Sequence, residues 1–394
     1  MTPRRPPAGP AALAAIAAAC ALAACSAPGR RAALRAEIDR AGAEASLPAP
    51  SPFGSAAPGV LHVHTRLSHD SPGPLGEIVD AARLTGVRWV ALTDHTNPAV
   101  AAEQPRGEVG GVLIVPGEEI SAWGGAVLSM GTDGSVRKRG QDFEEFRLEI
   151  RERGGIAFHG HATHFRGPLR RALDGLAVYD LSDDYRGVSA LDFPAVLACT
   201  STGDPGTSAE AYLLWVQGPG AAHRAIWDRL LADGPVPGVA ETNAHAKFRW
   251  FGRTWDPYAS LLGLVRNHAV LERLDEAALL NALRRGRLHV GFDAAGDSGG
   301  ARFEALLGGR TAAAMGDEIP FDPGLSLAIH LPAPARVTLL RDGVPWRTGS
   351  GRVLHYPVPG PGVYRAEADL HLGGRWRPWA WFNPVRVAAP GPAR

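Results

Sequence analysis

From Gly59 onward, short apolar runs alternate with segments that have the apolar spacing of an amphipathic helix. Each run has the length of a strand, and in chain order they read GVLHVHT, VRWVALTDH, GVLIVPGEEIS, GGIAFHGH, GLAVYDLSD and GVAETNAH. The segments with helical spacing are Leu75–Leu84, Phe143–Arg153, Ala222–Ala232 and Glu276–Arg285. Alternation of this kind predicts an α/β fold with a parallel sheet that closes into a barrel.

The C-terminal part of the chain has a different pattern. It consists of strand-like segments with turn signals such as RDG and PGPG between them. We therefore expect a small antiparallel β domain at residues 299–390, after a barrel at residues 58–298. The chain has 394 residues, 45% of them hydrophobic, which is enough for one large and one small domain.

The first 25 residues have the features of a secretory signal peptide. Arg4 and Arg5 precede an apolar run, Ala11 to Ala24, that is shorter than the roughly 20 residues of a membrane-spanning helix. The run ends in LAACS, which resembles a bacterial lipobox with Cys25 as the lipid-bearing residue. An ordinary secretory signal with a chance cysteine is the alternative. We expect an exported lipoprotein, on the periplasmic face of the outer membrane in a Gram-negative host and otherwise on the cell surface, with residues 26–57 as a tether.

Charge and cysteine content limit the partners. Lys plus Arg (41) nearly balances Asp plus Glu (40), so the formal net charge is +1 and no basic field for nucleic acid is present. Cleavage would remove Cys20 and lipid would occupy Cys25, which leaves Cys199 without a disulfide partner. We expect a small-molecule substrate, membrane contact only through the lipid, and no nucleic acid.

Candidate metal ligands lie at the ends of the predicted strands. Three pairs have the spacing i, i+2, which puts both side chains on one face of a strand. The pairs are His62 with His64, His159 with His161, and Asn243 with His245. His95 and Glu119 end two further predicted strands. In a β/α barrel the carboxyl ends of the strands converge on one mouth, so these side chains should meet there.

The combination of imidazole and carboxylate is ligand chemistry for Zn, Mn or Fe rather than for Mg or Ca. A single histidine after a strand is more often a loop residue than a ligand. Structural histidines would, however, scatter over both strand ends and the helices. Five clusters at one kind of strand end therefore predict a metal site.

The motifs HVHTRLSHDS, ALTDHTN, PGEEIS, GGIAFHGH and ETNAH resemble, in this order, those of the PHP (polymerase and histidinol phosphatase) superfamily. The stretch WDRLLADGPVPGVAETNAH and the tail are similar to its carbaryl-hydrolase-like branch, so the resemblance covers about residues 58–390. It implies a distorted (β/α)7 barrel that holds two or three metal ions. It also implies hydrolysis of phosphoesters or, in some relatives, of amide or carbamate bonds.

Carried over residue by residue, the resemblance implies a set of metal ligands. They are His62, His64, Asp70, His95, Glu119, His161, Asn243 and His245. His69 is the alternate to Asp70. Two positions depart from the family pattern: Asn243 stands where Asp is usual and brings no charge, and Gly125 stands where a further histidine often lies.

These departures leave alternatives open. His159 could replace the missing histidine, and Glu241 could restore the lost charge; otherwise the site is mono- or dinuclear, or degenerate. We expect one to three divalent ions, Zn, Mn or Fe, per chain. Metal would supply hydroxide at neutral pH. His159 and His164 are the candidate proton donors to the leaving group, and Asp94 is expected to point away from the ligands.

The residues that could contact a substrate each allow two interpretations. The cations that follow metal motifs could bind phosphate or be solvated loop charges; they are Arg166, Arg170, Arg171, Lys247 and Arg249. Trp250, Trp255 and Tyr258 could line an aryl pocket or pack the barrel against helices. The favoured hypothesis is a metal-dependent hydrolase, in the first place a phosphoesterase, with ester, amide or carbamate hydrolysis as variants. A catalytically degenerate binding or scaffold lipoprotein is the alternative, and metal delivery is a weaker third.

Overall fold

The computed structural model describes residues 28–46, 48, 51–122, 124–136, 143–165, 169, 173–216, 218, 220–250 and 252–390. The predicted signal peptide with Cys25, and the cations Arg166, Arg170 and Arg171, lie outside these ranges. None of the helices within them combines the length and the apolar composition that crossing a membrane requires.

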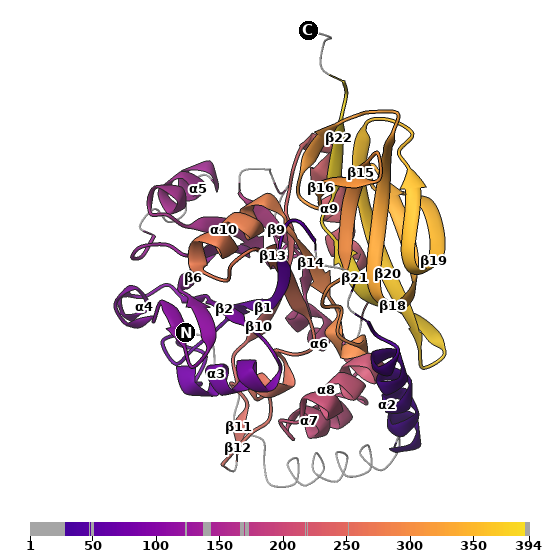
Figure 1. The fold of residues 1–394 in the computed structure, drawn as a ribbon. Helices are drawn as coiled ribbons and strands as arrows, with labels where there is room; N and C mark the ends of the chain where they lie inside the picture. Colours follow the sequence, from indigo (N-terminus) through magenta and orange to yellow (C-terminus); the bar gives the residue numbers. More distant parts are fainter. Residues whose placement is uncertain are drawn as a thin grey trace.

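The N-terminal two-thirds of the chain is mixed α/β and contains a closed ring of strands (Figure 1). Around the ring lie β1 (Ser55–Val63), β2 (Trp89–Leu92) with β3 (Asp94–His95), β5 (Val112–Val115) with β6 (Gly117–Ala122), β7 (Gly125–Met130), β8 (Ile156–Gly160), β9 (Gly175–Asp180) and β10 (Gly238–Ala244). The ring closes because β10 pairs in parallel with β1. β7 is antiparallel to both neighbours, so a hairpin interrupts the expected strand–helix alternation there.

The four predicted helices are confirmed, with bounds that differ by at most one residue at each end. They are α3 (Leu75–Leu84), α5 (Phe143–Glu152), α9 (Ala221–Asp233) and α10 (Glu276–Arg285). Asp275 caps α10 by accepting the Ala278 N–H, and Gly286 ends it at φ +74°. The sequence did not predict α4 (Pro98–Glu103), the short strand β4 (Gly107–Val109), or the helices between β9 and β10 that precede α9. These helices are α6 (Leu181–Arg186), α7 (Phe193–Thr200), α8 (Pro205–Ala211) and the π-helix η1 (Tyr212–Val216).

The C-terminal strands continue the sheet of the ring. The first residues of β1 pair with β13 (Arg266–Leu271), β13 pairs with β14 (Leu288–Gly291), and β14 pairs with β21 (Arg375–Phe382). The remaining strands are β15 (Arg302–Leu307), β16 (Arg310–Ala314), β17 (Glu318–Pro320), β18 (Leu325–Arg341), β19 (Val344–Pro357), β20 (Gly362–Leu372) and β22 (Val385–Ala388). The border expected at residues 298/299 thus lies within one 20-stranded sheet.

The two parts also share a hydrophobic core, in which Trp227 of α9 packs with residues of β18 to β22. Arg365 of β20 binds Asp228 of α9 through two contacts of 2.6 and 2.8 Å. Figure 1 shows these strands, in yellow and orange, as a layer beside the ring. The C-terminal strands are therefore packed on the α/β part rather than separated from it by a linker.

The segment expected to be a tether is partly built into the body. It contains helix α2 (Pro28–Ala43), whose Leu34 is buried. Arg31 and Arg35 each bind Glu210 of α8, at 2.8 and 2.9 Å. Because an apolar residue and two cations on one helix find fixed partners, this stretch docks on α8, and β1 already begins at Ser55.

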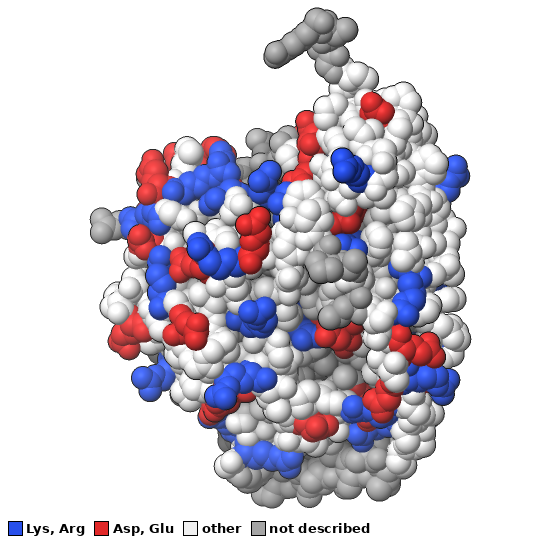
Figure 2. Space-filling view, viewed as in Figure 1, with Lys and Arg blue, Asp and Glu red and all other residues white. Residues whose placement is uncertain are grey.

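The surface charges are mixed in sign. Figure 2 shows Lys and Arg interspersed with Asp and Glu on the face viewed there, with no field of one sign. The expectation that no nucleic acid binds stays a prediction.

Candidate metal centre

Three ring strands end in an unusual backbone conformation. His62, His161 and Asn243, at the ends of β1, β8 and β10, have φ of 67°, 47° and 50°. Positive φ costs a non-glycine residue about 1–3 kcal/mol, and such strain concentrates at functional sites. At His62 the pairing of β1 with both neighbours shifts register between Leu61 and Val63.

This irregularity re-aims the histidines of β1. Leu61 packs with the ring-interior cluster, whereas Val60 and Val63 both pack under α3 on the outside. Strict alternation from Val60 would send His62 outward. The register shift instead turns His62 inward, so that it lies beside His64, with 5.1 Å between the ring centres.

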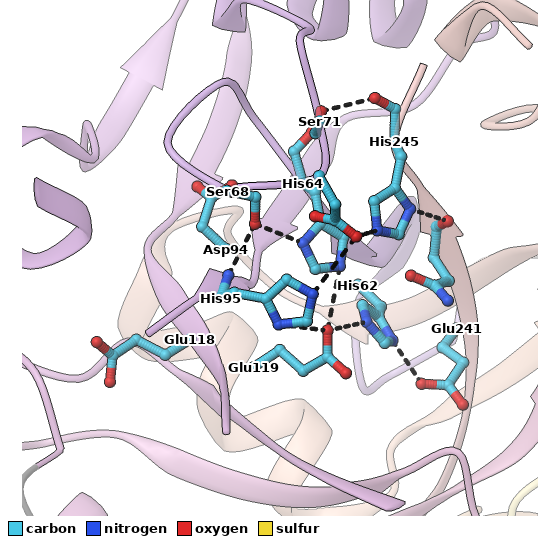
Figure 3. A network of polar contacts seen from close by, with 12 residues as sticks. His62, His64, Ser68, Ser71, Asp94, His95, Glu118, Glu119, Glu241 and His245 are labelled. Atoms are coloured by element: carbon cyan, nitrogen blue, oxygen red, sulfur yellow. Dashed lines mark hydrogen bonds and ion pairs between the residues drawn. The ribbon is translucent and has the colours of Figure 1, made fainter. Parts of the chain in front are cut away.

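Four imidazoles of the centre are held through Nδ1. The partners are Glu241 Oε2 for His62 at 2.7 Å, Ser68 Oγ for His64 at 2.9 Å, Asp180 Oδ2 for His161 at 2.7 Å, and the Asn243 carbonyl for His245 at 2.8 Å. Figure 3 shows the rings of His62, His64 and His245 gathered around one point. An Nδ1 contact of this kind fixes a ring so that Nε2 is presented as a metal ligand.

The Nε2 atoms face two carboxylates. Glu119 Oε2 lies 3.2 Å from His62 Nε2 and 3.4 Å from His64 Nε2, and Glu119 Oε1 lies 3.5 Å from His161 Nε2. Asp70 Oδ2 lies 2.9 Å from His245 Nε2. Two atoms that bind one ion at about 2.1 Å lie roughly 3–3.5 Å apart, so these separations suit shared coordination.

His95 connects the two carboxylates. Its Nδ1 is 3.4 Å from Glu119 Oε2, and its Nε2 is 3.5 Å from Asp70 Oδ2. Besides a group formed by His161, Asp180 and Glu241, ligand atoms within 4.8 Å of one another form two overlapping groups at the centre, His64–Asp70–His95–His245 and His62–His64–Glu119. His64 belongs to both groups.

Two observations show that these residues fit divalent metal ions. His64 Nε2 and Asp70 Oδ1 are buried and have no hydrogen-bond partner within the described part of the chain. A buried polar atom is costly unless it is satisfied, and a metal ion would satisfy both. The donor set of imidazole nitrogens and carboxylate oxygens suits Zn, Mn or Fe.

The electrostatics favour the metal-binding protonation states of several groups. Burial, with His62 and His245 nearby, holds the pKa of His64 well below its usual range, so this ring is neutral. Burial alone would raise the pKa of Glu119, but His62 and His161 outweigh it and hold that pKa far below its usual range. Burial would likewise raise the pKa of Asp70, but His245 and His95 outweigh burial and hold that pKa far below its usual range.

His62 and His161 hold protons that a metal would displace. Burial lowers the pKa of His62, but Glu119 and Glu241 outweigh burial and raise it to about 9. In the same way Glu241 and Asp180 outweigh burial and raise the pKa of His161 to about 11. Metal binding should therefore release protons at neutral pH.

The structure does not bring His159 into the centre. Its ring packs edge-on against Phe143 and Phe165, with centroid distances of 4.7 and 5.2 Å, next to α5. The same-face argument for His159 and His161 is wrong, because β8 ends at Gly160 and His161 turns inward through its positive φ. His159 is thus neither a replacement ligand nor a proton donor at the centre.

The other expected residues lie at the rim. His164 stacks on His161 at 5.3 Å, and its Nε2 is 3.0 Å from Asp183 Oδ1. His69 is exposed and lies with its ring 4.7 Å from that of His95. Asn243 contacts Ser182 Oγ through its amide nitrogen at 3.2 Å.

The place of the missing family histidine is filled. A Cβ at Gly125 would lie 2.3 Å from the ring of Phe165. No larger side chain fits there without moving Phe165, so this strand contributes no ligand.

Supporting residues were only partly visible in the sequence. Glu241 was expected to add charge; it also contacts His62 and accepts the His161 N–H at 2.8 Å. Asp94 points away from the ligands and accepts the Thr65 hydroxyl at 2.9 Å. The sequence did not identify Asp180 as a partner of the centre. Its position at the end of an apolar run could have indicated such a role, but that position is equally explained by Asp180 capping α6.

The aromatic and cationic residues after β10 have different roles, and only some of them lie near the centre. Tyr258 is buried and its hydroxyl donates to the His64 carbonyl at 2.6 Å, so it holds the backbone of a predicted ligand rather than lining a pocket. Trp250 is exposed, and Arg249 pairs with Glu77 at 2.6 Å. Lys247 is exposed near His245 and is the one cation of this segment that lines a pocket beside the centre.

Comparison with known proteins gives weak similarities. No protein-family model and no curated protein matches the sequence. A Bacteroides vulgatus structure, described as a two-domain protein containing a predicted PHP-like metal-dependent phosphoesterase, is 11% identical and has a TM-score of 0.40 over 85% of this chain and 97% of that one. A candidate metal-dependent phosphoesterase from Bifidobacterium adolescentis is 15% identical, with a TM-score of 0.30 over 51% of this chain and 91% of that one. Similarity at this level leaves the functional inference to the site itself.

Proposed function

We propose that this protein is a metal-dependent hydrolase of the PHP type that acts on phosphoesters. The observation that carries the proposal is the orientation of the four imidazoles: each Nδ1 has a partner, and each Nε2 faces Glu119 or Asp70. The order of the sequence motifs supports the same family, with the ring of strands as its distorted barrel.

The residues divide into two ligand groups in this proposal. His64, Asp70, His95 and His245 would hold one ion, and His62, His64, His161 and Glu119 would hold a second, so that His64 is shared by both groups. Divalent ions at such a site lower the pKa of a bound water toward neutrality and offset the charge that develops on the phosphoryl group.

The chain itself supplies orientation and protons. Glu241, Asp180, Ser68 and the Asn243 carbonyl hold the imidazoles in place. His164 lies at the rim with its Nε2 3.0 Å from Asp183 Oδ1, and we assign to it the transfer of a proton to the leaving group. Lys247 is placed to contact a phosphate oxygen.

Location and branch also belong to the proposal. The LAACS sequence supports an exported lipoprotein that contacts the membrane through lipid on Cys25. The similarity to the carbaryl-hydrolase-like branch supports aryl ester, amide or carbamate bonds as further substrates.

A second candidate is a binding or scaffold lipoprotein. Two features favour it: Asn243 stands in place of a carboxylate and so removes a charge, and Phe165 fills the space at Gly125 where the family pattern has a further ligand. The two candidates differ in metal content and turnover.

The test is elemental analysis of the chain from Ser26, purified without chelator, together with turnover of 4-nitrophenyl phosphate and bis(4-nitrophenyl) phosphate. A hydrolase should contain about two equivalents of Zn, Mn or Fe and release 4-nitrophenol. One equivalent or none after metal supplementation, without turnover, would establish the binding protein instead.

A further inference from the structure

A pocket of about 320 Å³ opens directly beside the candidate metal centre. His245 and Asn243 line the pocket, and His245 is also a member of the ligand group with His64, Asp70 and His95. Its volume lies at the small end of the range for small-molecule sites, so it suits a group about the size of one ring.

The wall of the pocket is apolar on the side of α6 and α7. It is formed by Leu181, Phe193, Val196, Leu197 and Leu261. Phe193 is 41% exposed, so it lies at the edge of the pocket and can be changed without opening the core. An apolar wall next to polar ligands is the usual arrangement of a site that binds a substrate with one apolar end.

Two buried polar atoms in the lining have no hydrogen-bond partner within the described residues, Tyr185 Oη and Asn243 Oδ1. Burial also holds the pKa of Tyr185 far above its usual range, so the phenol keeps its proton. A neutral buried hydroxyl is a donor that lacks an acceptor, and an acceptor on a bound group would satisfy it.

Two exposed cations and one half-buried carboxylate, Asp256, belong to the lining of the pocket. Lys247 and Arg186 both line it, and Arg186 is held by Asp183 at 2.6 Å. The pocket therefore has an apolar wall, one buried donor, and two exposed cations in its lining, of which Lys247 is two residues from His245 in the chain.

Resting on the proposed hydrolase function, we propose that this pocket receives the leaving group of the substrate. The substrate is a phosphoester of a compact, predominantly apolar alcohol, an aromatic ring or branched alkyl group, that carries one hydrogen-bond acceptor for Tyr185. The phosphoryl group lies toward His245 and Lys247. In the reaction water adds to phosphorus, the P–O bond to the alcohol breaks, and the alcohol leaves with a proton.

The first test compares two stable phosphonates by calorimetry on the Mn²⁺-loaded protein. Phenylphosphonate and methylphosphonate share the charged group and differ in the apolar part. We expect phenylphosphonate to bind at least about tenfold more tightly, because only its ring enters the pocket. Equal affinities would overturn the pocket assignment.

A matched pair of variants locates the effect. Phe193→Asp places a charge on the pocket edge, whereas Leu191→Asp makes the same change two residues away at a position that is 89% exposed. Phe193→Asp should weaken phenylphosphonate about tenfold and leave methylphosphonate unchanged. Leu191→Asp should change neither, and equal losses in both variants would overturn the proposal.

Binding of 4-nitrophenol alone separates this proposal from the proposed function, because it requires no phosphoryl site. Weaker binding of 4-nitrophenol to Phe193→Asp would support the pocket even if neither phosphonate binds. In that case the phosphoesterase proposal alone would fail. We also expect the wild type to prefer 4-nitrophenol, which carries an acceptor for Tyr185, over phenol, and Tyr185→Phe to lose this preference. Absence of 4-nitrophenol binding to the folded wild-type chain would overturn the pocket.

Discussion

Two buried clusters of this protein combine histidines with carboxylates and differ in what neutralises those carboxylates. The candidate metal centre lies at the ends of the ring strands. The second cluster, called here the β13–β14 cluster, consists of Arg266, His268, His289, Asp293 and Ser298. Its two imidazoles stack at 4.5 Å with an interplanar angle of 2°.

In the β13–β14 cluster a guanidinium pairs with the buried carboxylate. Arg266 Nε lies 2.5 Å from Asp293 Oδ2, which also accepts from His268 Nε2 at 2.7 Å. Ser298 Oγ donates to the other oxygen of Asp293 at 2.7 Å. The carboxylate is therefore fully paired within the protein, as a buried charge must be.

In the metal centre neither carboxylate has such a partner. The ion pairs of Glu119 and Asp70 within the described residues are with imidazoles only. Buried imidazole nitrogens without a partner occur in both clusters, at His64 and at His268 and His289. An unpaired nitrogen alone thus does not identify a metal site; this one is distinguished by carboxylates that pair with imidazoles and with no guanidinium or ammonium group among the described residues.

The largest expected effect comes from His64→Ala, which removes the ligand shared by both groups. Bound metal should fall below one equivalent, and turnover of 4-nitrophenyl phosphate should fall at least about 1,000-fold, because both groups lose a ligand. Elemental analysis and initial rates measure this. Normal metal content and activity would disprove the site assignment.

The matched change in the β13–β14 cluster is His268→Asn. It should lower the free energy of unfolding by about 1–3 kcal/mol, since a buried hydrogen bond to Asp293 is lost. Metal content should be unchanged. Loss of metal in this variant would mean that the two clusters are not independent.

Metal removal should have the next largest effect. At free metal about 1,000-fold above Kd, binding stabilises the native state by about 4 kcal/mol. Chelation should therefore lower Tm of the wild type and of His268→Asn by the same amount, and should not change Tm of His64→Ala. A Tm that is insensitive to chelator in the wild type would contradict metal binding at the centre.

A smaller effect is expected for Glu241→Gln. The change keeps the shape but removes the charged acceptor of His62 Nδ1, so metal affinity should fall about 10–100-fold. Competition with a chromogenic chelator measures this. Ser298→Ala, which removes the corresponding support in the β13–β14 cluster, should leave the affinity unchanged.

The smallest effect is a pH dependence, with an alkaline loss of stability that belongs to the metal centre alone and an acid loss in which both clusters share. In the metal-free protein the pKa values of His62 and His161 are raised from 6.5 to about 9 and 11. Their contribution to stability is complete below about pH 6.5 and is lost as pH rises through 9 and then 11. Burial instead lowers the pKa of His289, and likewise that of His64, so stability should be lost at both rings as pH falls below about 6.5.

Thermal melts of the chelated protein from pH 5 to 10 test this. Tm should decline on both sides of neutrality, and metal should remove the alkaline decline because it replaces the protons on His62 and His161. His62→Asn should weaken the alkaline limb and His289→Gln the acid limb. An alkaline limb that is unchanged in His62→Asn would contradict the assignment.

Much of the centre could be predicted from local pattern. Apolar runs that end in His or Glu placed the imidazoles and Glu119 at strand ends, and such ends meet at one mouth of a barrel. Asp70 followed from the motif resemblance. The four helices could be predicted because helical spacing and, for α10, its caps are encoded within a few residues.

Other features could not be predicted because they depend on contacts between distant segments. Residue alternation predicts one face for His159 and His161, yet a positive φ separates them, and a register shift that both neighbours of β1 share turns His62 inward. The docking of α2 depends on Glu210, far along the chain.

By itself, the sequence determined which residue types stand at the strand ends, and so the class of chemistry at the centre. Only the tertiary structure decided which of those side chains point inward, that Glu241 and Asp180 hold two of the rings, and that Arg266 closes the second cluster. The physical reason is that ligand chemistry belongs to single residues, whereas orientation and charge neutralisation depend on partners that the fold brings together.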